Sequence, residues 1–514
     1  MHSRAILHLR SYTTKTAVPL TATRFPSIKR NPAFKTLDSN DIAAFKKILP
    51  DETSVVDGTD PDALLPFNQD WMRKFRGQSQ LVLKPKTSHQ VSQLLKYCND
   101  HRIGVVPQGG NTGLVGGSVP VHDEVVLSTQ AMNRIRAFDQ ESGILTCEAG
   151  CILESLDHML AEKGYMMPLD LGAKGSCHIG GNLATNAGGL RLLRYGSLHG
   201  TVLSMEVVLA DGTIVELGKP LRKDNTGYDL KQLFIGSEGT LGIITAASIL
   251  TPLKPKAVNV AVLGVSSYES VQKLFQEARG HLSEILSAFE FFDASCMALV
   301  QKHIATSRLP FDTAAQFYVL IETSGSNKDH DDEKLTTFLD SVMEKGWVVD
   351  GTVAQDATQV AAFWSIRESI TEACAKEGPN YKYDLSVPLP KLYGLVTDMR
   401  QHLSQVGVMT DSMSGKPFVK QVVGFGHVGD GNLHLNVIAS EWSKDIERAI
   451  EPKVYDLVQT AYGSVSAEHG IGLSKTIYLS HSKTKDAIAM MRSLKQTFDP
   501  KGILNPYKYF PNKE

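Results

Sequence analysis

The stretch PQGGNTGLVGGSVP, residues 107–120, decides how the first half of the chain is interpreted. It follows the apolar residues 103–107, which predict a strand, and its glycines let backbone N–H groups approach a ligand without interference from Cβ atoms. A pyrophosphate can be bound in this way. The loop lacks the Lys-Ser/Thr ending of a P-loop, and its glycine spacing does not match the nicotinamide fingerprint. Taken alone, it is equally consistent with tight turns between strands.

Two further glycine-rich stretches follow, and together the three resemble a known flavin fold. The stretch LDLGAKGSCHIGGN at 169–182 continues to Gly189, and GSEGTLGII at 236–244 comes after a strand and a tight turn at 207–213. Three such loops in this order are similar to the FAD-binding domain of the vanillyl-alcohol-oxidase type. That resemblance implies an α+β fold in which two lobes hold an extended FAD between them.

The same resemblance implies which residues bind the flavin and how. Many members of that superfamily attach FAD through a histidine of the first loop, and the matching position here is Asn111. Non-covalent FAD is therefore expected, with Cys177 and His178 serving packing and loop structure. The expected FAD contacts come from the three loops and the chain's C-terminal end: Pro107, Gln108, Gly109, Gly110, Asn111, Thr112, Gly113, Gly172, Ser176, Gly180, Gly181, Asn186, Gly242, Ile243 and Asn505.

The second half of the chain has a different pattern, beginning after Pro255. Strand-like segments at 258–263, 288–292, 317–321 and 347–349 alternate with helical segments at 268–280 and 332–345. Two βαβ units in succession predict a ferredoxin-like antiparallel sheet with helices on one face. Such a sheet would form a substrate (cap) domain over the flavin.

Within this cap, the stretch GFGHVGDGNLHLN at 424–436 predicts a hairpin that carries a metal site. If residues 429–432 form the turn, Val428 pairs with Leu433 and His427 lies directly opposite His434, with Cβ atoms about 5 Å apart. Asn436 would lie on the same face as His434 because side chains alternate along a strand. Glu468, in SAEHGIG at 466–472, could complete a set of two histidines and one carboxylate. That set favours zinc, with manganese or iron as alternatives.

A carboxylate site is predicted nearby from three polar side chains. Arg367 and Thr371 are four residues apart in a predicted helix and would share a face, and Lys382 follows on a strand. A guanidinium and an ammonium that converge suit a carboxylate ligand. The alternative is an exposed helix face on which Arg367 pairs with Glu368 or Glu372.

Four stretches together identify the chain as similar to the FAD-linked D-2-hydroxy acid dehydrogenases, and among them to the mitochondrial enzymes acting on D-2-hydroxyglutarate. They are residues 107–120, 169–182, 426–436 and 466–472. The resemblance implies hydride transfer from C2 of the substrate to FAD, giving 2-oxoglutarate, with His469 as the catalytic base. It also implies the metal ligands His427, His434 and Glu468, and substrate contacts from Arg367, Thr371, Lys382, Asn436 and His469. The family signature DPxGILNPGK has Tyr507 here in place of its final glycine.

Three alternatives remain open from the sequence. The substrate could be D-lactate, as in the cytochrome-type D-lactate dehydrogenases. The flavin could serve a non-redox synthase, as in the ether-lipid synthases of the same superfamily. The histidines and Glu468 could belong to a metal hydrolase, although the three FAD loops would then have no role.

Composition and the N-terminus indicate location and partners. The 514 residues are 42% hydrophobic and 21% charged with a formal net charge of -2, which does not favour a nucleic-acid partner, and no apolar run is long enough to span a bilayer. The six cysteines show no paired pattern, which suits a reducing compartment. The first 37 residues contain no Asp or Glu and several Arg and Lys, which predicts a mitochondrial transit segment; a basic tail is the alternative.

The expected organisation has four parts: a transit or disordered segment (1–37), an FAD-binding domain (38–255), a cap with the metal hairpin (256–460) and a helical C-terminal segment returning to the FAD domain (461–514). The expected location is the mitochondrial matrix. The expected electron acceptor is an electron-transfer flavoprotein, cytochrome c or a second keto acid, and a homodimer is a further expectation.

Overall fold

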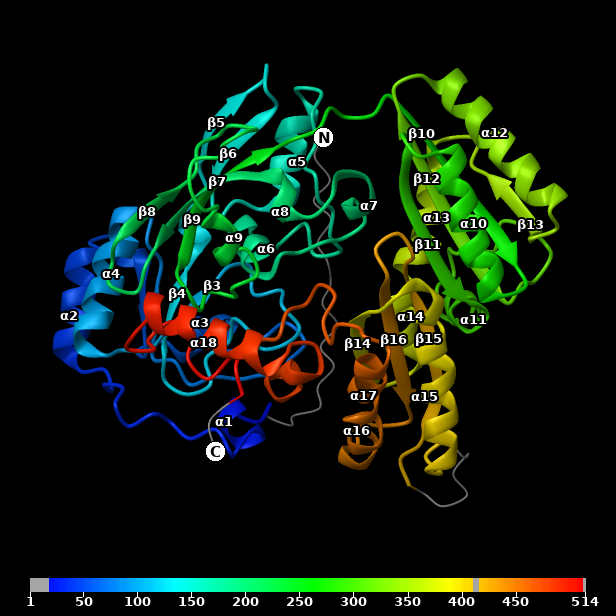
Figure 1. Ribbon diagram of the computed structural model, residues 1–514. Helices are drawn as coiled ribbons and strands as arrows, with labels where there is room; N and C mark the ends of the chain where they lie inside the picture. The colour runs from blue at the N-terminus through cyan, green and yellow to red at the C-terminus, as the bar shows by residue number, and fades with distance from the viewer. Residues whose placement is uncertain (1–17, 410–415, 512–514) are drawn as a thin grey trace, which may run out of the picture.

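The computed structural model describes residues 18–409 and 416–511 and divides into two parts that face each other (Figure 1). The first part, blue to green with the red C-terminal end, contains two mixed lobes. The second part, green to orange, is the cap. The chain enters the cap at about residue 256, stays bonded to it through residue 467, and meets the first part again at Glu468.

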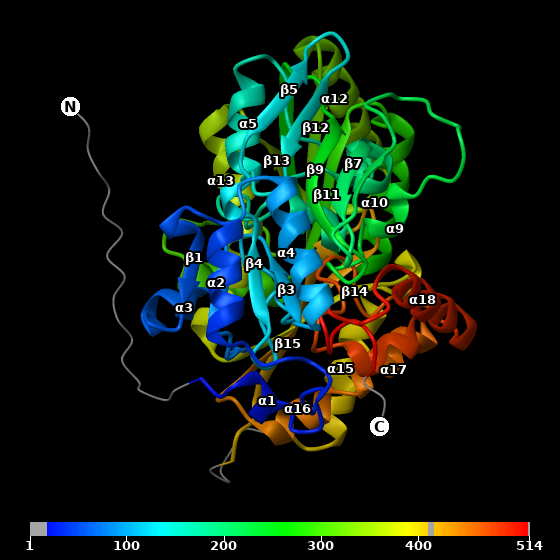
Figure 2. The ribbon, with the colours of Figure 1, turned by 90° about the vertical axis from the view of Figure 1, so that its left-hand side faces the viewer.

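The first lobe is built on a four-stranded sheet in the order β1-β2-β4-β3, in which β2, β4 and β3 are parallel and β1 is antiparallel. Helices α2 and α4 cover one face and α3 the other, and Figure 2 shows α2 and α4 in blue toward the viewer. Their apolar faces bury Phe45, Leu94 and Leu95 against the strands. The elements are α1 (Thr21–Arg24), α2 (Ser39–Ile48), β1 (Val55–Asp57), α3 (Pro61–Asn68), β2 (Leu81–Leu83), α4 (Ser88–His101), β3 (Val105–Gln108) and β4 (Val125–Ser128).

The second lobe is a five-stranded antiparallel sheet in the order β5-β6-β9-β7-β8. Helices α5 and α6 pack on it through Leu156, Leu160 and Leu183. The elements are β5 (Ile135–Asp139), β6 (Ile144–Glu148), α5 (Leu153–Ala161), α6 (Ile179–Thr185), α7 (Leu192–Tyr195), α8 (Leu198–Thr201), β7 (Val202–Val208), β8 (Ile214–Leu217), α9 (Lys231–Phe234) and β9 (Ile243–Leu250).

The cap is a seven-stranded antiparallel sheet in the order β13-β10-β12-β11-β15-β16-β14. Its first four strands in the sequence have the order 4-1-3-2 of a ferredoxin-like unit, which confirms the predicted topology. Strands β15, β16 and β14 extend this unit beyond β11. The strands are β10 (Ala257–Val265), β11 (Leu286–Asp293), β12 (Phe317–Gly325), β13 (Val348–Val353), β14 (Asn380–Ser386), β15 (Val419–His427) and β16 (Asn432–Ala439).

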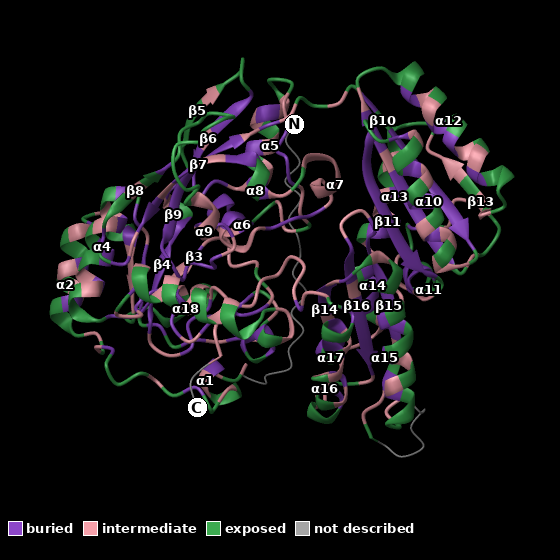
Figure 3. Cartoon of the chain, viewed as in Figure 1, coloured by how far each residue is buried: buried purple, intermediate pink, exposed green. Residues whose placement is uncertain are grey.

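Helices cover both faces of the cap sheet, so the expectation of helices on one face was wrong. Alternate residues of β11 explain the difference: Phe289 and Phe291 point to one apolar layer and Phe292 to another. The helices on the face of Phe289 and Phe291 are α10 (Tyr268–His281), α12 (Lys328–Glu344), α15 (Gly394–Gln405), α16 (Lys444–Ile450) and α17 (Lys453–Thr460). The helices on the face of Phe292 are α11 (Ala294–His303), α13 (Ala357–Glu368) and α14 (Ile370–Glu377). Figure 3 shows the strands buried between exposed helix surfaces.

The N-terminal segment differs from the expected division at residue 37. Residues 1–17 lie outside the described residues. Residues 18–37 pack on the folded protein, because Thr21, Ile28 and Phe34 are buried and Arg30 pairs with Asp123. The described part of the expected transit or disordered segment therefore packs on the first lobe, and the transit function of the N-terminus stays a prediction.

The C-terminal residues lie against the flavin lobes. Leu504 pairs in parallel with Val105 of β3, and Ile503 and Leu504 are buried in the first lobe's core. Helix α18 (Lys485–Phe498) crosses the surface of the same part. Across residues 18–409 and 416–511, no helix combines the length and the apolar character needed to cross a bilayer.

Candidate functional site

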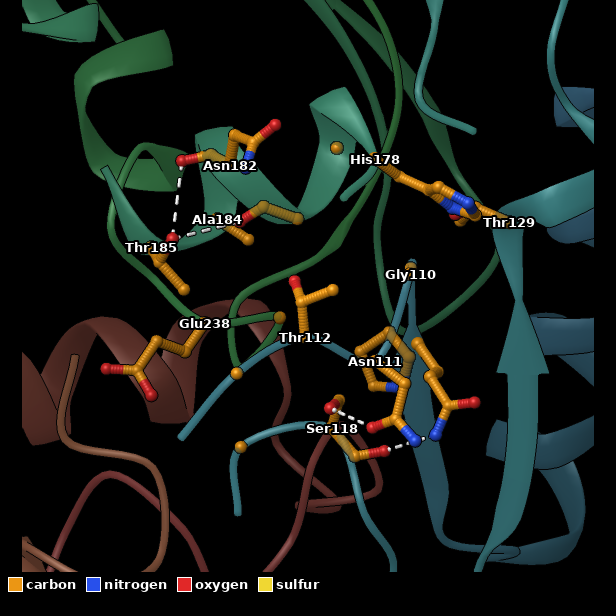
Figure 4. Close-up of a pocket in the computed structure, with 18 of the residues that line it drawn as sticks. Gly110, Asn111, Thr112, Ser118, Thr129, His178, Asn182, Ala184, Thr185 and Glu238 are labelled. Carbon is orange, nitrogen blue, oxygen red and sulfur yellow. Dashed lines mark hydrogen bonds between the residues drawn. The ribbon is translucent and has the colours of Figure 1, made fainter. Parts of the chain in front are cut away.

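A cavity lies where the three glycine-rich loops meet, between the two lobes (Figure 4). Eleven of the expected FAD contacts line it: Pro107, Gln108, Gly109, Gly110, Asn111, Thr112, Gly113, Gly180, Gly181, Gly242 and Ile243. His469, from the returning C-terminal segment, also lines the cavity. The cavity therefore connects the expected flavin loops with the expected catalytic base.

Four expected FAD contacts do not line this cavity: Gly172, Ser176, Asn186 and Asn505. Two of them support its walls. The carbonyl of Ser176 lies against Gly110, and the Asn505 amide donates to the carbonyls of Gly117 and Glu238 at 3.0 and 2.8 Å. Ser176 and Asn505 therefore affect the cavity indirectly, by contacting the loops that line it.

The cavity's polar atoms suit a ligand rich in hydrogen-bonding groups. Thr129 Oγ1, His178 Nδ1 and Asn182 Oδ1 are buried lining atoms that have no hydrogen-bond partner among the described residues. Buried polar groups of this kind are normally satisfied. The backbone also approaches closely, since a Cβ on Gly110 would lie 2.0 Å from the Ser176 carbonyl oxygen. These features fit the pyrophosphate and ring system of FAD.

Asn111, at the position where related enzymes carry a histidine, has a role in holding the first loop. Its backbone is left-handed, with φ of 54°. Its amide nitrogen donates to the carbonyls of Pro66 and Gln69 at 3.1 and 2.8 Å, and its amide oxygen accepts from Ser118 Oγ at 2.9 Å (Figure 4). An amide used in this way offers no nucleophile for a covalent flavin bond.

The two hairpin histidines face each other, although the strand register differs from the expected one. The turn is residues 428–431, so His427 pairs with Asn432, and His434 pairs with Phe425. The predicted register was wrong because the turn lies one residue nearer the N-terminus, at residues 428–431 instead of 429–432. The alternation of side chains still places both histidines on one face as diagonal neighbours.

The distance between the imidazoles fits two ligands of one tetrahedral metal ion. His427 Nε2 and His434 Nε2 are 3.4 Å apart. Two nitrogens that each lie about 2.05 Å from a tetrahedral zinc are separated by about 3.4 Å. The pKa of His434 lies well below its usual range because of burial and the nearby His427, which keeps its imidazole neutral. A neutral imidazole is the form that binds metal.

His427 is held from behind by a buried glutamate. Its Nδ1 lies 2.6 Å from Glu290 Oε1, and Glu290 Oε2 accepts from Arg367 Nε at 2.9 Å. Burial lowers the pKa of His427, but the Glu290 carboxylate outweighs it and raises this pKa to about 9. The carboxylate therefore fixes a proton on Nδ1 and orients Nε2 toward His434; because the ring is cationic at neutral pH, a metal ion would have to displace the proton on Nε2.

Glu468 and His469 are organised by a second buried carboxylate, Asp384 of β14. Asp384 Oδ2 accepts from the backbone N–H groups of Glu468 and His469 at 2.8 and 3.0 Å, and it lies 3.6 Å from His469 Nδ1. Burial lowers the pKa of His469 in spite of this neighbour. Its Nε2 can therefore accept a proton near neutral pH.

The structure brings the expected metal ligands together only in part. In residues 18–409 and 416–511, one group of three acidic or histidine side chains has possible ligand atoms that all lie within 4.8 Å of one another: Asp384, Glu468 and His469. Glu468 Oε1 accepts from the Gly189 N–H at 2.6 Å. The Asp384 oxygens already accept from backbone and from Asn432 Nδ2, so this residue supports the neighbouring side chains rather than offering free ligand atoms.

The expected carboxylate-binding residues are placed unevenly. The predicted continuous helix is interrupted: α13 ends at Glu368 and α14 begins at Ile370, so Arg367 is buried whereas Thr371 is exposed. The shared face of Arg367 and Thr371 was therefore wrong. Lys382 is half-buried, has a pKa lowered by burial, and forms no hydrogen bond or ion pair with any described residue. Asn436 lies opposite Lys382, and its amide oxygen accepts from Asn380.

Sequence reasoning did not single out three acidic residues of the site. They are Glu238, which lines the flavin cavity, and the supporting carboxylates Glu290 and Asp384. Glu238 lies in the glycine-rich stretch 236–244, so the sequence indicated that it would be near the flavin. Glu290 lies between two phenylalanines of β11, and Asp384 lies between Tyr383 and Leu385 of β14. A charge at an inward strand position was the available signal.

Family comparisons define the class of the protein. Residues 79–218 match the model described as "FAD binding domain", and residues 254–509 match "FAD linked oxidases, C-terminal domain". Both parts of the fold are therefore those of an FAD-linked oxidase, an FAD-dependent oxidoreductase.

Relatives of known description narrow this class. The chain is 57% identical over 479 residues to a mitochondrial D-2-hydroxyglutarate dehydrogenase of Danio rerio, covering 93% of this chain and 86% of the relative. It is 54% identical to a putative mitochondrial D-lactate dehydrogenase of Schizosaccharomyces pombe, covering 94% and 93%. It is 48% identical to a D-2-hydroxyglutarate–pyruvate transhydrogenase of Saccharomyces cerevisiae, covering 95% and 98%. The chain belongs to the family of the mitochondrial D-2-hydroxyglutarate dehydrogenases.

A solved structure confirms the expected fold type. The crystal structure of p-cresol methylhydroxylase with substrate bound has a TM-score of 0.73 at 16% identity, covering 92% of this chain and 98% of that chain. At this identity the likeness shows the fold alone. The vanillyl-alcohol-oxidase-type α+β fold predicted from the loops is thereby confirmed.

The close packing of the first two loops gives a testable prediction. In Gly110→Ala the added methyl group collides with the Ser176 carbonyl, and overpacking of this kind costs about 1–3 kcal/mol. We expect the purified variant to contain less FAD and the apoenzyme to bind FAD at least about tenfold more weakly in a fluorescence titration. Gly200→Ala is the control, because no atom lies within 4 Å of its Cβ position. Equal FAD affinity in the wild type and Gly110→Ala would contradict the proposed packing.

Proposed function

We propose that this protein oxidises D-2-hydroxyglutarate to 2-oxoglutarate in the mitochondrial matrix, with non-covalently bound FAD as the hydride acceptor. The observation that carries the proposal is the pair of opposed Nε2 atoms of His427 and His434. Glu290, which binds Arg367, and Lys382 lie on the same face of the cap sheet. The family and the names of its mitochondrial relatives support the substrate and the location.

A divalent metal would be held by His427, His434 and Glu468, whose Oε1 also accepts from the Gly189 N–H. Two imidazoles and a carboxylate leave an open position and favour zinc. A bound metal would supply Lewis-acid polarisation of the C2 hydroxyl, and bound FAD would supply the acceptor for the hydride from C2. The fit rests on the 3.4 Å between the two Nε2 atoms and on the neutral state of His434.

The chain's own residues orient the substrate and take its proton. His469 Nε2 accepts the C2 hydroxyl proton, while Asp384 lies beside Nδ1 and stabilises the imidazolium that forms. Arg367 and Lys382 hold carboxylate groups, and the amide nitrogen of Asn436, which has no hydrogen-bond partner among the described residues, completes the substrate contacts. Fixing C2 relative to the flavin in this way lowers the entropic part of the barrier.

Lys382 favours a substrate with two carboxylates. Arg367 is partly neutralised by Glu290, whereas the Lys382 ammonium has no anionic partner among the described residues. A second carboxylate, present in D-2-hydroxyglutarate and absent from D-lactate, would satisfy it. The name of the Schizosaccharomyces relative keeps D-lactate as the second candidate.

The reoxidant and the assembly are further parts of the proposal. An electron-transfer flavoprotein or cytochrome c would take electrons from the reduced flavin, and the transhydrogenase name of the Saccharomyces relative favours a second keto acid as an alternative. A homodimer is proposed as the assembly. A metal hydrolase is disfavoured because the flavin cavity would have no role, and a non-redox synthase is distinguished by the experiment below.

Anaerobic reduction of the bound flavin tests the function directly. We expect D-2-hydroxyglutarate to bleach the visible flavin absorbance and to yield 2-oxoglutarate in equal amount, with D-lactate slower and L-2-hydroxyglutarate inactive. Chelation should slow bleaching without releasing FAD, and added Zn²⁺ should restore it. Faster bleaching by D-lactate would favour the second candidate. A flavin spectral change without a keto acid product would favour the synthase.

Loss of Lys382 should separate the two candidate substrates. Because a charged hydrogen bond contributes about 1.5–3 kcal/mol, Lys382→Met should raise KM for D-2-hydroxyglutarate about 10- to 100-fold and leave that for D-lactate within about threefold. Lys376→Met is the control, since Lys376 is exposed and pairs with Glu372. Equal changes for both substrates would contradict a role in binding the second carboxylate.

Replacement of His469 should affect turnover more than binding. His469→Gln removes the proton acceptor, and we expect kcat to fall about 10²- to 10⁴-fold with a smaller change in KM. His481→Gln is the matched control, because His481 pairs with Asp456, away from Asp384. Steady-state kinetics with D-2-hydroxyglutarate measure both variants. An unchanged kcat in His469→Gln rules out its role as the base.

A further inference from the structure

Glu290 stands between two functional side chains that bind different groups. It lies on β11 and is 2% exposed. One oxygen, Oε1, is 2.6 Å from His427 Nδ1, and the other, Oε2, lies 2.9 and 2.8 Å from Arg367 Nε and Nη2. Each oxygen therefore serves one partner, and one carboxylate fixes both side chains.

The contact with His427 determines which nitrogen is available to a metal. A carboxylate without a proton accepts hydrogen bonds only, so Nδ1 must carry the hydrogen. When a metal ion displaces the other ring proton, the lone pair is therefore on Nε2, which faces His434 Nε2. A carboxylate behind a metal-binding histidine commonly fixes the ring in this way, and its loss typically costs 10- to 100-fold in metal affinity.

The contact with Arg367 determines which edge of the guanidinium is available to an anion. Glu290 takes the Nε and Nη2 edge, and the ring of Phe425 lies 4.9 Å from the guanidinium carbon. Nη1 forms no hydrogen bond to any described residue. The arginine is thereby held with its Nη1 side available, and the flexibility that usually opposes ligand binding is removed before the ligand arrives.

We propose that Glu290 is the positioning residue that couples metal binding at His427 to carboxylate binding at Arg367. The inference rests on the proposed function, because it takes the metal and the substrate carboxylate as the two ligands. Glu290 itself touches neither of them. Through Glu290, the affinity for the metal depends on Arg367, and the affinity for the substrate carboxylate depends on His427.

The Glu290→Gln variant separates this role from simple packing, because the two side chains have nearly the same shape. The amide has one accepting oxygen and a donating NH₂ group. If the oxygen faces Arg367, the NH₂ faces His427 Nδ1 and drives the hydrogen to Nε2, which blocks the metal-binding atom. If the oxygen faces His427, the NH₂ opposes the Arg367 N–H groups. One of the two partners is lost in either orientation.

Zinc affinity is the first measurement, made on the FAD-containing protein by competition with a chromophoric chelator. We expect Glu290→Gln to bind Zn²⁺ about 10- to 100-fold more weakly than the wild type. Glu290→Asp keeps the charge with a shorter reach and should lose less. Glu322→Gln is the matched control: Glu322 lies on the same sheet face on β12 and accepts from Trp364 and Ser287 rather than from His427 or Arg367.

Coupling is the second measurement and uses Arg367→Met in both backgrounds. We expect Arg367→Met to change zinc affinity severalfold in the wild type and by less than twofold in Glu290→Gln. With Zn²⁺ saturating, Glu290→Gln should also raise KM for D-2-hydroxyglutarate about tenfold. Flavin content and thermal unfolding verify that each variant is folded.

The outcomes separate the coupling from the function on which it rests. Zinc binding by Glu290→Gln equal to the wild type, or an equal loss in Glu322→Gln, overturns the coupling while leaving the function intact. Loss of zinc affinity without any effect of Arg367→Met also overturns it. A wild-type protein that D-2-hydroxyglutarate reduces but that binds no Zn²⁺ overturns the metal site and the coupling together. A wild-type protein that D-2-hydroxyglutarate does not reduce overturns the substrate assignment.

Discussion

The site depends on two negative charges buried in the cap sheet. Glu290 and Asp384 are each at most 2% exposed, and a carboxylate at this depth is stable only when donors and cations surround it. Glu290 is satisfied by His427 and Arg367, and Asp384 by Asn432 and the backbone of residues 468–469. Because those same partners are the proposed metal ligands, anion-binding group and base, the solvation of two carboxylates arranges most of the site.

The second requirement is that the cap and the flavin lobes meet at a fixed position. The segment that follows the cap supplies this connection: Glu468 Oε1 accepts from the Gly189 N–H, and the Glu238 carboxylate accepts from Ile471 and Gly472 at 2.7 Å each. Burial of Glu238 raises its pKa to about 7, while the two backbone donors oppose that rise. His469 lies between these two anchors and reaches the flavin cavity.

Much of this arrangement could be predicted from local patterns, and the exceptions have physical causes. The glycine loops, the ferredoxin-like order and the pair of hairpin histidines follow from short-range rules. The hairpin register could not be fixed, because GHVGDGN allows more than one turn position and a shift of one residue on each strand keeps both histidines on one face. The interruption at Ser369 has no glycine or proline to mark it. Glu290 lies 77 residues from Arg367 and 137 from His427, and no local pattern indicates such a contact.

The position of Asn505 has a consequence for how the protein is made. Its amide ties Gly117 of the first flavin loop to Glu238 of the third, and Leu504 beside it pairs with β3. The loops around the flavin cavity are thus held together by a contact between residues that are 388 positions apart in the sequence. During synthesis from the N-terminus, both lobes leave the ribosome before the residue that closes them. A chain interrupted anywhere in the cap would lack the contact by which Asn505 ties the first flavin loop to the third.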